Sequence, residues 1–384
     1  MTLSPTSISN ILPPEFKLLS YKQIASLWSN YGHIYRLTLD VSSSTTPKPL
    51  ILKAIHPPSN DDASESHLRK LLSYKVERWF YHHLAPRLRL SQIKVSKVYL
   101  TRQQLDSKNE DDGNLFLEDL STEFPFPADG SLGKQPTLSI LDWLAGFHGT
   151  FFTVHGREAL ELVPPPKEFE HASTSVKGVW RRGTYWYLDT RREELSEMNE
   201  EEYSWLMPWI AKVNNAIDKE ILTYGTLLHG DVKGANILLN RNPYDSSRHS
   251  PARSRSHIAP VSEDLPLRAA LYDFQYVGIG LSTLDLVYFI GTSIQSSLLS
   301  SSSEMNLLRH YHSALLTVIR DQTKAETNTS PYPFDVFLKH WELAIVDWYR
   351  FMAGWGFWGN DRWAEQRAKE IVKEWGADPT TAPA

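Results

Sequence analysis

The sequence of 384 residues contains no cysteine, which excludes disulfide bonds, thiolate metal sites and a cysteine nucleophile. No run of residues approaches the roughly 20 apolar residues that a membrane-spanning helix requires. The start of the chain also lacks the charged and apolar regions of a secretory signal peptide. We therefore expect a cytoplasmic protein without a membrane span.

An excess of positive charge is also absent. Lys and Arg number 40 and Asp and Glu number 45, so the formal net charge is −5. This balance provides no overall field for attracting nucleic acid or an anionic membrane, and we expect no nucleic-acid partner. No obligate protein partner is evident, and 41% hydrophobic residues are enough for a large core.

Hydrophobic patterns divide the chain into a strand-rich first part and a helix-rich second part. Alternating or short apolar runs predict strands over 31–39, 49–55, 94–100 and 114–118, of which the first two are predicted to form a hairpin. Apolar residues at helical spacing predict helices over 67–84, 138–152 and 201–222. Ser, Thr and Pro dominate residues 1–14, which predicts a flexible tail. Residues 241–266 are rich in Ser, Arg and Pro, which predicts a disordered insertion.

The most informative string is the polar segment 229–236, which lies between two apolar runs. Phosphoryl transfer needs a carboxylate that accepts the proton of the attacking hydroxyl and side-chain oxygens that hold magnesium. Asp231 suits the first role. Asn236, five residues further on in the same loop, suits the second.

A second string, 269–273, reads as an apolar strand that ends in Asp273. A carboxylate at the end of a buried strand can reach into a cleft and bind metal ions between phosphates. The separation of Asp273 from Asp231 is longer than two adjacent strands need. The insertion at 241–266 accounts for the excess, so the two strings are predicted to form a hairpin.

His-Gly-Asp-Val-Lys-Gly-Ala-Asn, from His229, and Tyr-Asp-Phe-Gln, from Tyr272, together resemble the motifs of a known group of small-molecule kinases. This group comprises the aminoglycoside phosphotransferases, the choline kinases and the ecdysteroid kinase-like proteins. The resemblance implies an α+β class and a bilobal protein-kinase-like fold, with a β-rich N-lobe over 15–118 and a mainly helical C-lobe over 119–384. It also implies ATP and Mg²⁺ as cofactors and a hydroxyl of a small molecule as the acceptor.

The same resemblance implies roles for residues in both lobes. Lys53 resembles the lysine that binds the α- and β-phosphates, and Glu77 resembles the glutamate that pairs with it. Backbone groups near Glu118 and Leu120 resemble the hinge that binds adenine. Lys233 resembles a loop lysine that contacts the γ-phosphate, which places it with the catalytic residues.

Two nearby residues are predicted to be structural. His229 is expected to hydrogen-bond the loop backbone, and Asp285 resembles the aspartate that braces the catalytic loop. The short separation of Asp273 and Asp285 leaves no room for the long activation segment of a protein kinase. A catalytically silent kinase fold that binds nucleotide or a partner stays an alternative.

The acceptor itself is not readable from the sequence, although two aromatic segments bear on it. The tryptophans near the C-terminus suggest a cage for a quaternary ammonium group. Trp341, Trp348 and Trp355 fall at helical spacing, which favours core packing, so Trp358 is the better pocket candidate. Residues 177–187 mix cations with aromatic rings, and we expect them to line the acceptor pocket.

Overall fold

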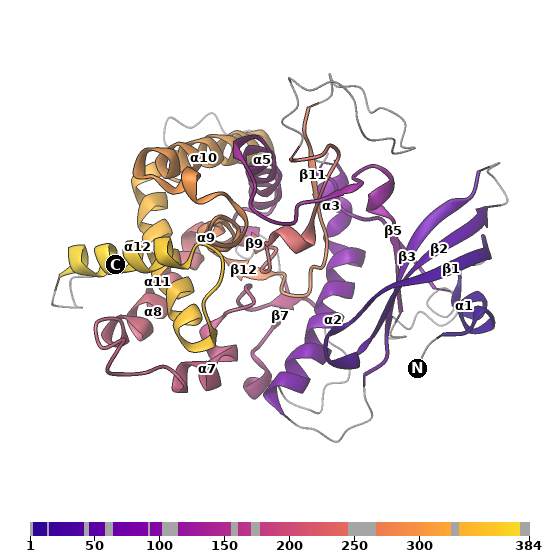
Figure 1. Cartoon of the computed structure of the whole chain (residues 1–384), viewed down its shortest axis with the longest axis horizontal. Coiled ribbons are helices and arrows are strands. Elements are labelled where there is room, and N and C mark those ends of the chain that lie inside the picture. Colours follow the sequence, from indigo (N-terminus) through magenta and orange to yellow (C-terminus); the bar gives the residue numbers. More distant parts are fainter. Residues whose placement is uncertain are drawn as a thin grey trace.

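The computed structural model describes residues 3–13, 15–41, 46–57, 64–90, 93–101, 114–154, 160–169, 177–244, 266–323 and 330–376. A twisted antiparallel sheet near the N-terminus faces a larger, mainly helical part, and a long helix lies between them (Figure 1). The predicted α+β class and bilobal kinase-like fold are confirmed. The lobe boundary at residues 118 and 119 stays a prediction.

The N-terminal sheet has five strands in the order β1-β2-β3-β5-β4. Their bounds are β1 Phe16–Ser26, β2 Gly32–Val41, β3 Lys48–Ile55, β4 Val98–Tyr99 and β5 Asn114–Glu118. β2 and β3 form the predicted hairpin, in which Ile34 is paired with Lys53. β3 in turn pairs with β5, so the strand that carries Lys53 is central in the sheet.

The prediction of a flexible tail over 1–14 is wrong for most of its length. Helix α1, Pro5–Ile11, begins with Ser4 as its N-cap. Ile8 and Leu12 are fully buried with Phe16 and apolar residues of β2 and β3. The composition of this segment is polar, but its few large apolar residues recur at helical spacing and cover one face of the sheet.

Helix α2, Glu65–His83, connects the sheet to the rest of the molecule, and α3, Ala85–Leu90, follows it. Phe80 of α2 stacks on Phe274, which directly follows Asp273, and the two ring centroids are 4.2 Å apart. Both rings are fully buried. An aromatic contact of this kind fixes α2 against the segment that carries Asp273.

The C-terminal part is built on helices that share one large core. They are α5 Lys134–Thr150, α7 Arg192–Ser196, α8 Met207–Tyr224, α9 Ser282–Ser293, α10 Ser301–Thr323, α11 Phe334–Trp355 and α12 Asp361–Trp375. α10 packs along α5, while α11 contacts α7, α8, α9 and α12 (Figure 1). In the part of the chain that the structure describes, none of the helices combines the length and apolarity of a membrane span.

Short strands at the base of the helical part carry the two informative strings. They are β6 Phe126–Pro127, β7 Leu162–Val163, β8 Val179–Trp180, β9 Thr226–Leu228, β10 Ile237–Leu239, β11 Ala269–Leu271 and β12 Gly278–Gly280. β10 pairs antiparallel with β11, which confirms the predicted hairpin. Residues 245–265 of the predicted insertion lie outside the described residues.

Candidate active site

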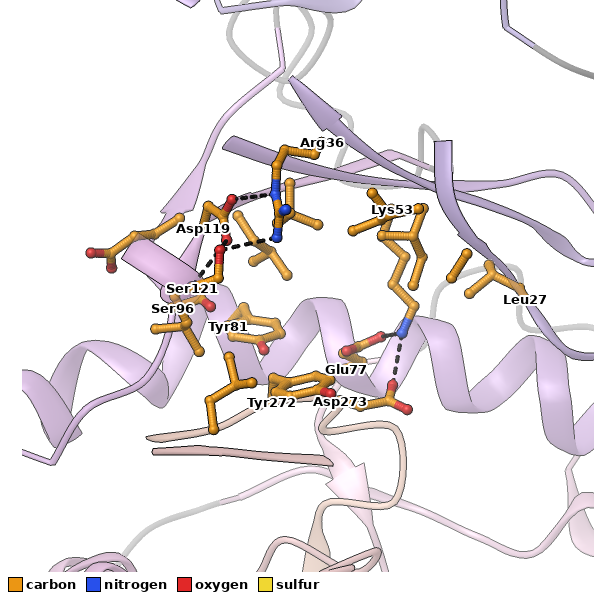
Figure 2. Close-up of a pocket in the computed structure, with 18 residues that line it drawn as sticks. Leu27, Arg36, Lys53, Glu77, Tyr81, Ser96, Asp119, Ser121, Tyr272 and Asp273 are labelled. Carbon is orange, nitrogen blue, oxygen red and sulfur yellow. Dashed lines mark hydrogen bonds and ion pairs between the residues drawn. The ribbon is translucent and has the colours of Figure 1, made fainter. Parts of the chain in front are cut away.

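A cavity of about 310 Å³ opens between the sheet and the helical part (Figure 2). Apolar side chains of β1, β2 and β3 cover one side of it, and Leu238 of β10 lies among the residues on the other. The polar residues that line it are Arg36, Lys53, Glu77, Ser96, Glu118, Asp119, Ser121 and Asp273. The cavity therefore joins the predicted phosphate-binding lysine, the predicted hinge and the predicted metal ligand.

Lys53 lies at the centre of an ion-paired triad at one end of this cavity (Figure 2). Its Nζ donates to Glu77 Oε2 at 2.6 Å and to Asp273 Oδ1 at 2.8 Å. Lys53 and Glu77 are buried, whereas the side chain of Asp273 is 33% exposed. Three residues from a strand, a helix and a loop therefore meet, although Lys53 and Asp273 are 220 positions apart in the sequence.

Burial and charge act in opposite directions on the triad. Burial by itself lowers the pKa of Lys53, but the negative charges of Asp273 and Glu77 outweigh it and raise that pKa above its ordinary value. Burial alone raises the pKa of Asp273, and Lys53 reverses the effect so that this pKa is lowered. Burial raises the pKa of Glu77, and the negative charge of Asp273 adds to this rise, so the positive charge of Lys53 offsets only part of it. Lys53 and Asp273 are therefore both charged at neutral pH.

The loop between β9 and β10 carries the predicted base. Lys233 Nζ lies 3.0 Å from Asp231 Oδ2, and Asn236 Nδ2 donates to the same oxygen and to the Asp231 backbone carbonyl, each at 2.9 Å. The other carboxylate oxygen, Asp231 Oδ1, is buried and accepts no hydrogen bond of normal geometry from the described residues, although the Tyr288 hydroxyl is close enough for the Asp231 carboxylate to raise its pKa. A buried carboxylate oxygen without a donor is unfavourable unless a ligand supplies one.

The electrostatics of Asp231 suit a group that gains and loses a proton. Burial raises its pKa above the ordinary value, and the positive charge of Lys233 offsets only part of that effect. Asp273 lies close enough for its negative charge to raise the pKa of Asp231 further. The structure therefore brings the predicted base and the predicted metal ligand into one electrostatic site.

Asp285, in the first turn of α9, holds the backbone of this loop. Its carboxylate accepts from the N–H groups of His229, at 2.7 Å, and Gly230, at 2.9 Å. His148 of α5 supports the same carboxylate, with Nε2 at 3.0 Å from Asp285 Oδ2 and Nδ1 at 2.7 Å from Tyr311 Oη. All of these side chains are buried.

The sequence predicts the positions of His229 and Asp285 but not that of His148. The side chain of His229 contacts the carbonyl of Tyr272 at 3.0 Å, and burial lowers its pKa. This is the structural contact expected of it. The only signal for His148 is a polar side chain on the apolar face of a predicted helix.

Gly230 is required by the geometry of the loop. Its φ angle is +84°, and a Cβ atom there would lie 2.1 Å from the carbonyl oxygen of Tyr276. Tyr185 also donates its backbone N–H to the Gly230 carbonyl at 2.7 Å. Any side chain at this position would displace the turn that contains Tyr276, against which the loop of Asp231 packs.

Gly230→Ala should lower the free energy of unfolding by at least about 1–3 kcal/mol, because backbone strain and a clash act together. Chemical denaturation measures the change. Gly356→Ala is a matched control, since its φ of +135° is also unfavourable but no atom lies within 4 Å of the added Cβ. An equal loss in the two variants would contradict the argument from the clash.

The predicted hinge residues line the cavity at the end opposite the Lys53 triad (Figure 2). Leu120 begins a short 3₁₀ helix, Leu120–Thr122, so its N–H has no partner within that helix. The side chain of Glu118 pairs with Lys94 at 2.9 Å and its backbone N–H donates to the Lys97 carbonyl at 2.8 Å, which leaves its backbone carbonyl for a ligand. Asp119 caps the 3₁₀ helix by accepting from the N–H of Ser121 at 3.0 Å.

Arg36 of β2 extends across this end of the cavity (Figure 2). Its Nε lies 2.7 Å from Asp119 Oδ2, and its Nη2 donates to Ser121 Oγ at 3.0 Å. The bridge ties the sheet to the hinge. No motif marks Arg36 in the sequence, because its partners lie more than eighty positions away.

The donor set fits a metal ion that is shared with phosphates. Among the described residues, no three His, Asp or Glu side chains gather into a complete metal site. Mg²⁺ commonly takes only one or two protein oxygens and completes its shell with water and substrate phosphates. Asp273 and Asn236 provide two such oxygens, and Asp273 adopts a φ of +68°, which non-glycine residues rarely take.

A sheet-covered cavity, a lysine with two carboxylate partners and an aspartate in a braced loop define a kinase-like protein. The sequence profile of the ecdysteroid kinase-like family matches residues 29–249 and 261–323. The chain belongs to this family. The gap in the match falls within the insertion predicted at 241–266. Among curated proteins, none is significantly similar in sequence.

Solved structures of small-molecule kinases resemble this chain distantly. Choline kinase from Cryptosporidium parvum has 11% identity and a TM-score of 0.49, with 99% of this chain and 97% of that chain covered. Ethanolamine kinase from Plasmodium vivax has 13% identity and a TM-score of 0.40, with 92% of this chain and 81% of that chain covered. An aminoglycoside phosphotransferase from Alicyclobacillus acidocaldarius has 11% identity and a TM-score of 0.40, with 97% of this chain and 96% of that chain covered. Membership of the family rests on its sequence profile and not on these structures.

Proposed function

We propose that the protein transfers the γ-phosphoryl group of ATP, with Mg²⁺, to a hydroxyl of a small molecule. The observation that carries this proposal is the buried, unpartnered Oδ1 of Asp231, held in a braced loop beside Asp273 and the Lys53 triad. An acceptor hydroxyl supplies the donor that this oxygen lacks. Phosphoryl transfer relies mainly on positioning and charge stabilisation, which this arrangement suits.

The residues around the cavity bind and orient the nucleotide. Backbone groups at Glu118 and Leu120 take the adenine edge, between the apolar side chains that line the cavity. Lys53 binds phosphate oxygens, and Glu77 keeps its ammonium group in place and charged. Because the Lys53 Nζ is already positioned, little side-chain entropy is lost when the phosphates bind.

Asp273 and Asn236 would hold the metal. When bound there, Mg²⁺ neutralises the negative charge of the phosphates. The Nδ2 group of Asn236 faces Asp231, so the amide oxygen of Asn236 points away from that carboxylate. Asn236 thereby orients the base with one end of its amide and offers a ligand oxygen with the other.

Asp231 orients the acceptor hydroxyl through Oδ1 and takes its proton as the hydroxyl oxygen bonds to the γ-phosphorus. The bond from that phosphorus to the bridging oxygen breaks at the same time, and ADP leaves. Lys233 lies beside Asp231 Oδ2 with 38% of its side chain exposed, so it can also reach a γ-phosphate oxygen. A positive charge in that place keeps the aspartate ionised and stabilises the charge that develops during transfer.

A panel of acceptors tests the activity. The purified protein is incubated with Mg·ATP and amino alcohols, sugars, sterols or aminoglycosides, and ATP consumption is followed for each class. We expect acceptor-dependent consumption with at least one class. Tight Mg·ATP binding without turnover across the panel would favour the silent nucleotide-binding alternative.

The pH profile tests the electrostatic role of Lys233. Activity requires ionised Asp231, so kcat/KM is lost as the pH falls through the raised pKa of this carboxyl group. The acid limb should therefore lie above the ordinary range of about 3.9. Lys233→Met removes the charge that lowers the Asp231 pKa, so the acid limb should move to higher pH. An unmoved acid limb in Lys233→Met would contradict the coupling.

A further inference from the structure

The guanidinium group of Arg191 occupies an aromatic box beside the catalytic loop. Its centre lies 4.2 Å from the ring centroid of Tyr185, 5.0 Å from that of Trp355 and 5.7 Å from that of Phe351. These distances are those of cation–π contacts. Arg191 is 1% exposed, so the chain's own cation fills the box.

Polar contacts hold Arg191 in this position. Its Nε donates to the Tyr185 carbonyl at 2.9 Å, and its Nη1 donates to Glu194 Oε1 at 3.0 Å. Nη2 is buried and has no hydrogen-bond partner among the described residues. The aromatic rings therefore provide much of the compensation for burying this charge.

The box borders the place where an acceptor would approach Asp231. Tyr185 donates its backbone N–H to the Gly230 carbonyl at 2.7 Å. The Lys233 ammonium group lies 6.0 Å from the ring centroid of Tyr185. Trp355, which is 48% exposed, forms the open edge of the box. The predicted acceptor-lining segment 177–187 thus contributes Tyr185, and Trp355 rather than Trp358 provides the exposed ring at this site.

The charges around the box are unfavourable for a second cation. Glu194 is paired with Arg191, and Asp231 is paired with Lys233. Arg69 is also close, since the charge of Arg191, in addition to burial, lowers its pKa. An ammonium-bearing alcohol would find the ring faces taken and the nearby carboxylates neutralised.

We propose that Arg191 is a specificity-determining residue that excludes alcohols bearing an ammonium group by occupying the aromatic box itself. The inference rests on the proposed function, because it assumes that the acceptor lies beside Asp231. It predicts that choline, ethanolamine and polyamine alcohols are poor ligands of the wild-type protein. Removing Arg191 leaves three aromatic rings around a space that suits a quaternary ammonium group.

Calorimetric binding of choline and of its neutral carbon isostere, without nucleotide, tests the proposal independently of catalysis. Arg191→Ala should bind choline at least about tenfold more tightly than the wild type does, with no comparable gain for the isostere. Arg191→Lys keeps a cation in the box and should show no gain. Mg·ATP binding to each variant confirms that the fold and the nucleotide site are intact.

Two results would overturn the proposal. One is equal choline affinity in Arg191→Ala and the wild type, both of which bind Mg·ATP. The other result, which needs no variant, is that the wild-type protein binds choline more tightly than it binds the neutral isostere. Failure of the proposed function gives a different pattern, in which the choline results stand but no acceptor is phosphorylated.

Discussion

Asp231→Asn should reduce kcat by about a hundredfold to ten-thousandfold, because the variant retains the shape of the side chain but loses the base. Mg·ATP affinity should change little, since Lys53, Glu77 and the hinge are untouched. Steady-state kinetics with an acceptor found in the panel give kcat, and calorimetry gives the nucleotide affinity. A loss confined to kcat is the signature of a group that acts in the transition state.

Asp321→Asn is a matched control for this variant. Asp321 is exposed on α10, so the same change of charge and atoms should leave turnover at the wild-type level. Wild-type turnover in Asp231→Asn would remove Asp231 as the base. A large loss of Mg·ATP affinity in that variant would instead place Asp231 in nucleotide binding.

Asp273→Ala is expected to weaken Mg·ATP binding and to reduce kcat/KM by about a hundredfold or more, because a metal ligand and one partner of Lys53 are lost together. Calorimetry with and without Mg²⁺ separates these two effects. Without the metal, the difference in ATP affinity between the variant and the wild type reports the lost partner of Lys53, and it should be much smaller than the difference measured with Mg²⁺.

Lys53→Ala provides the comparison for Asp273→Ala. Lysine removal weakens phosphate binding whether or not Mg²⁺ is present, whereas loss of Asp273 should weaken it mainly with the metal. Equal Mg·ATP affinity in Asp273→Ala and the wild type would contradict the assignment of Asp273 as a metal ligand.

Local pattern predicted the elements on which the site is built. Alternating residues predicted the β2–β3 hairpin, helical spacing predicted α2, and two apolar strings predicted the β10–β11 pair. The structure brings Lys53 together with Glu77 and Asp273, in the arrangement that the family resemblance implied. The chemical roles of these residues stay predictions until the variants are measured.

Composition was a poorer guide than spacing. Polar residues dominate the start of the chain, yet the apolar side chains of Leu3, Ile8, Ile11 and Leu12 pack it onto the sheet. The predicted helix over 201–222 begins only at Met207, because Pro208 is suited to the first turn of a helix and not to its interior. The tryptophan stripe predicted core packing correctly for Trp341 and Trp348, which are buried.

The sequence patterns do not indicate the roles of residues that act through contacts with distant parts of the chain. His148 lies 137 positions from Asp285, and Arg36 lies 85 positions from Ser121. Arg191 fills a box of three aromatic rings, of which the second and third, Phe351 and Trp355, come from α11 much later in the chain. Such contacts depend on how whole elements pack, which no local period specifies.

Transfer of a labelled γ-phosphate tests directly whether the protein phosphorylates a small molecule. The wild-type protein and Asp231→Asn are incubated with γ-labelled ATP, Mg²⁺ and a protein-free extract of small metabolites, and the labelled products are identified. If the protein is such a kinase, a labelled small-molecule phosphate ester forms with the wild type, requires Mg²⁺ and is lost in Asp231→Asn. Label that stays in ATP, or that passes only to inorganic phosphate or to protein, would contradict it.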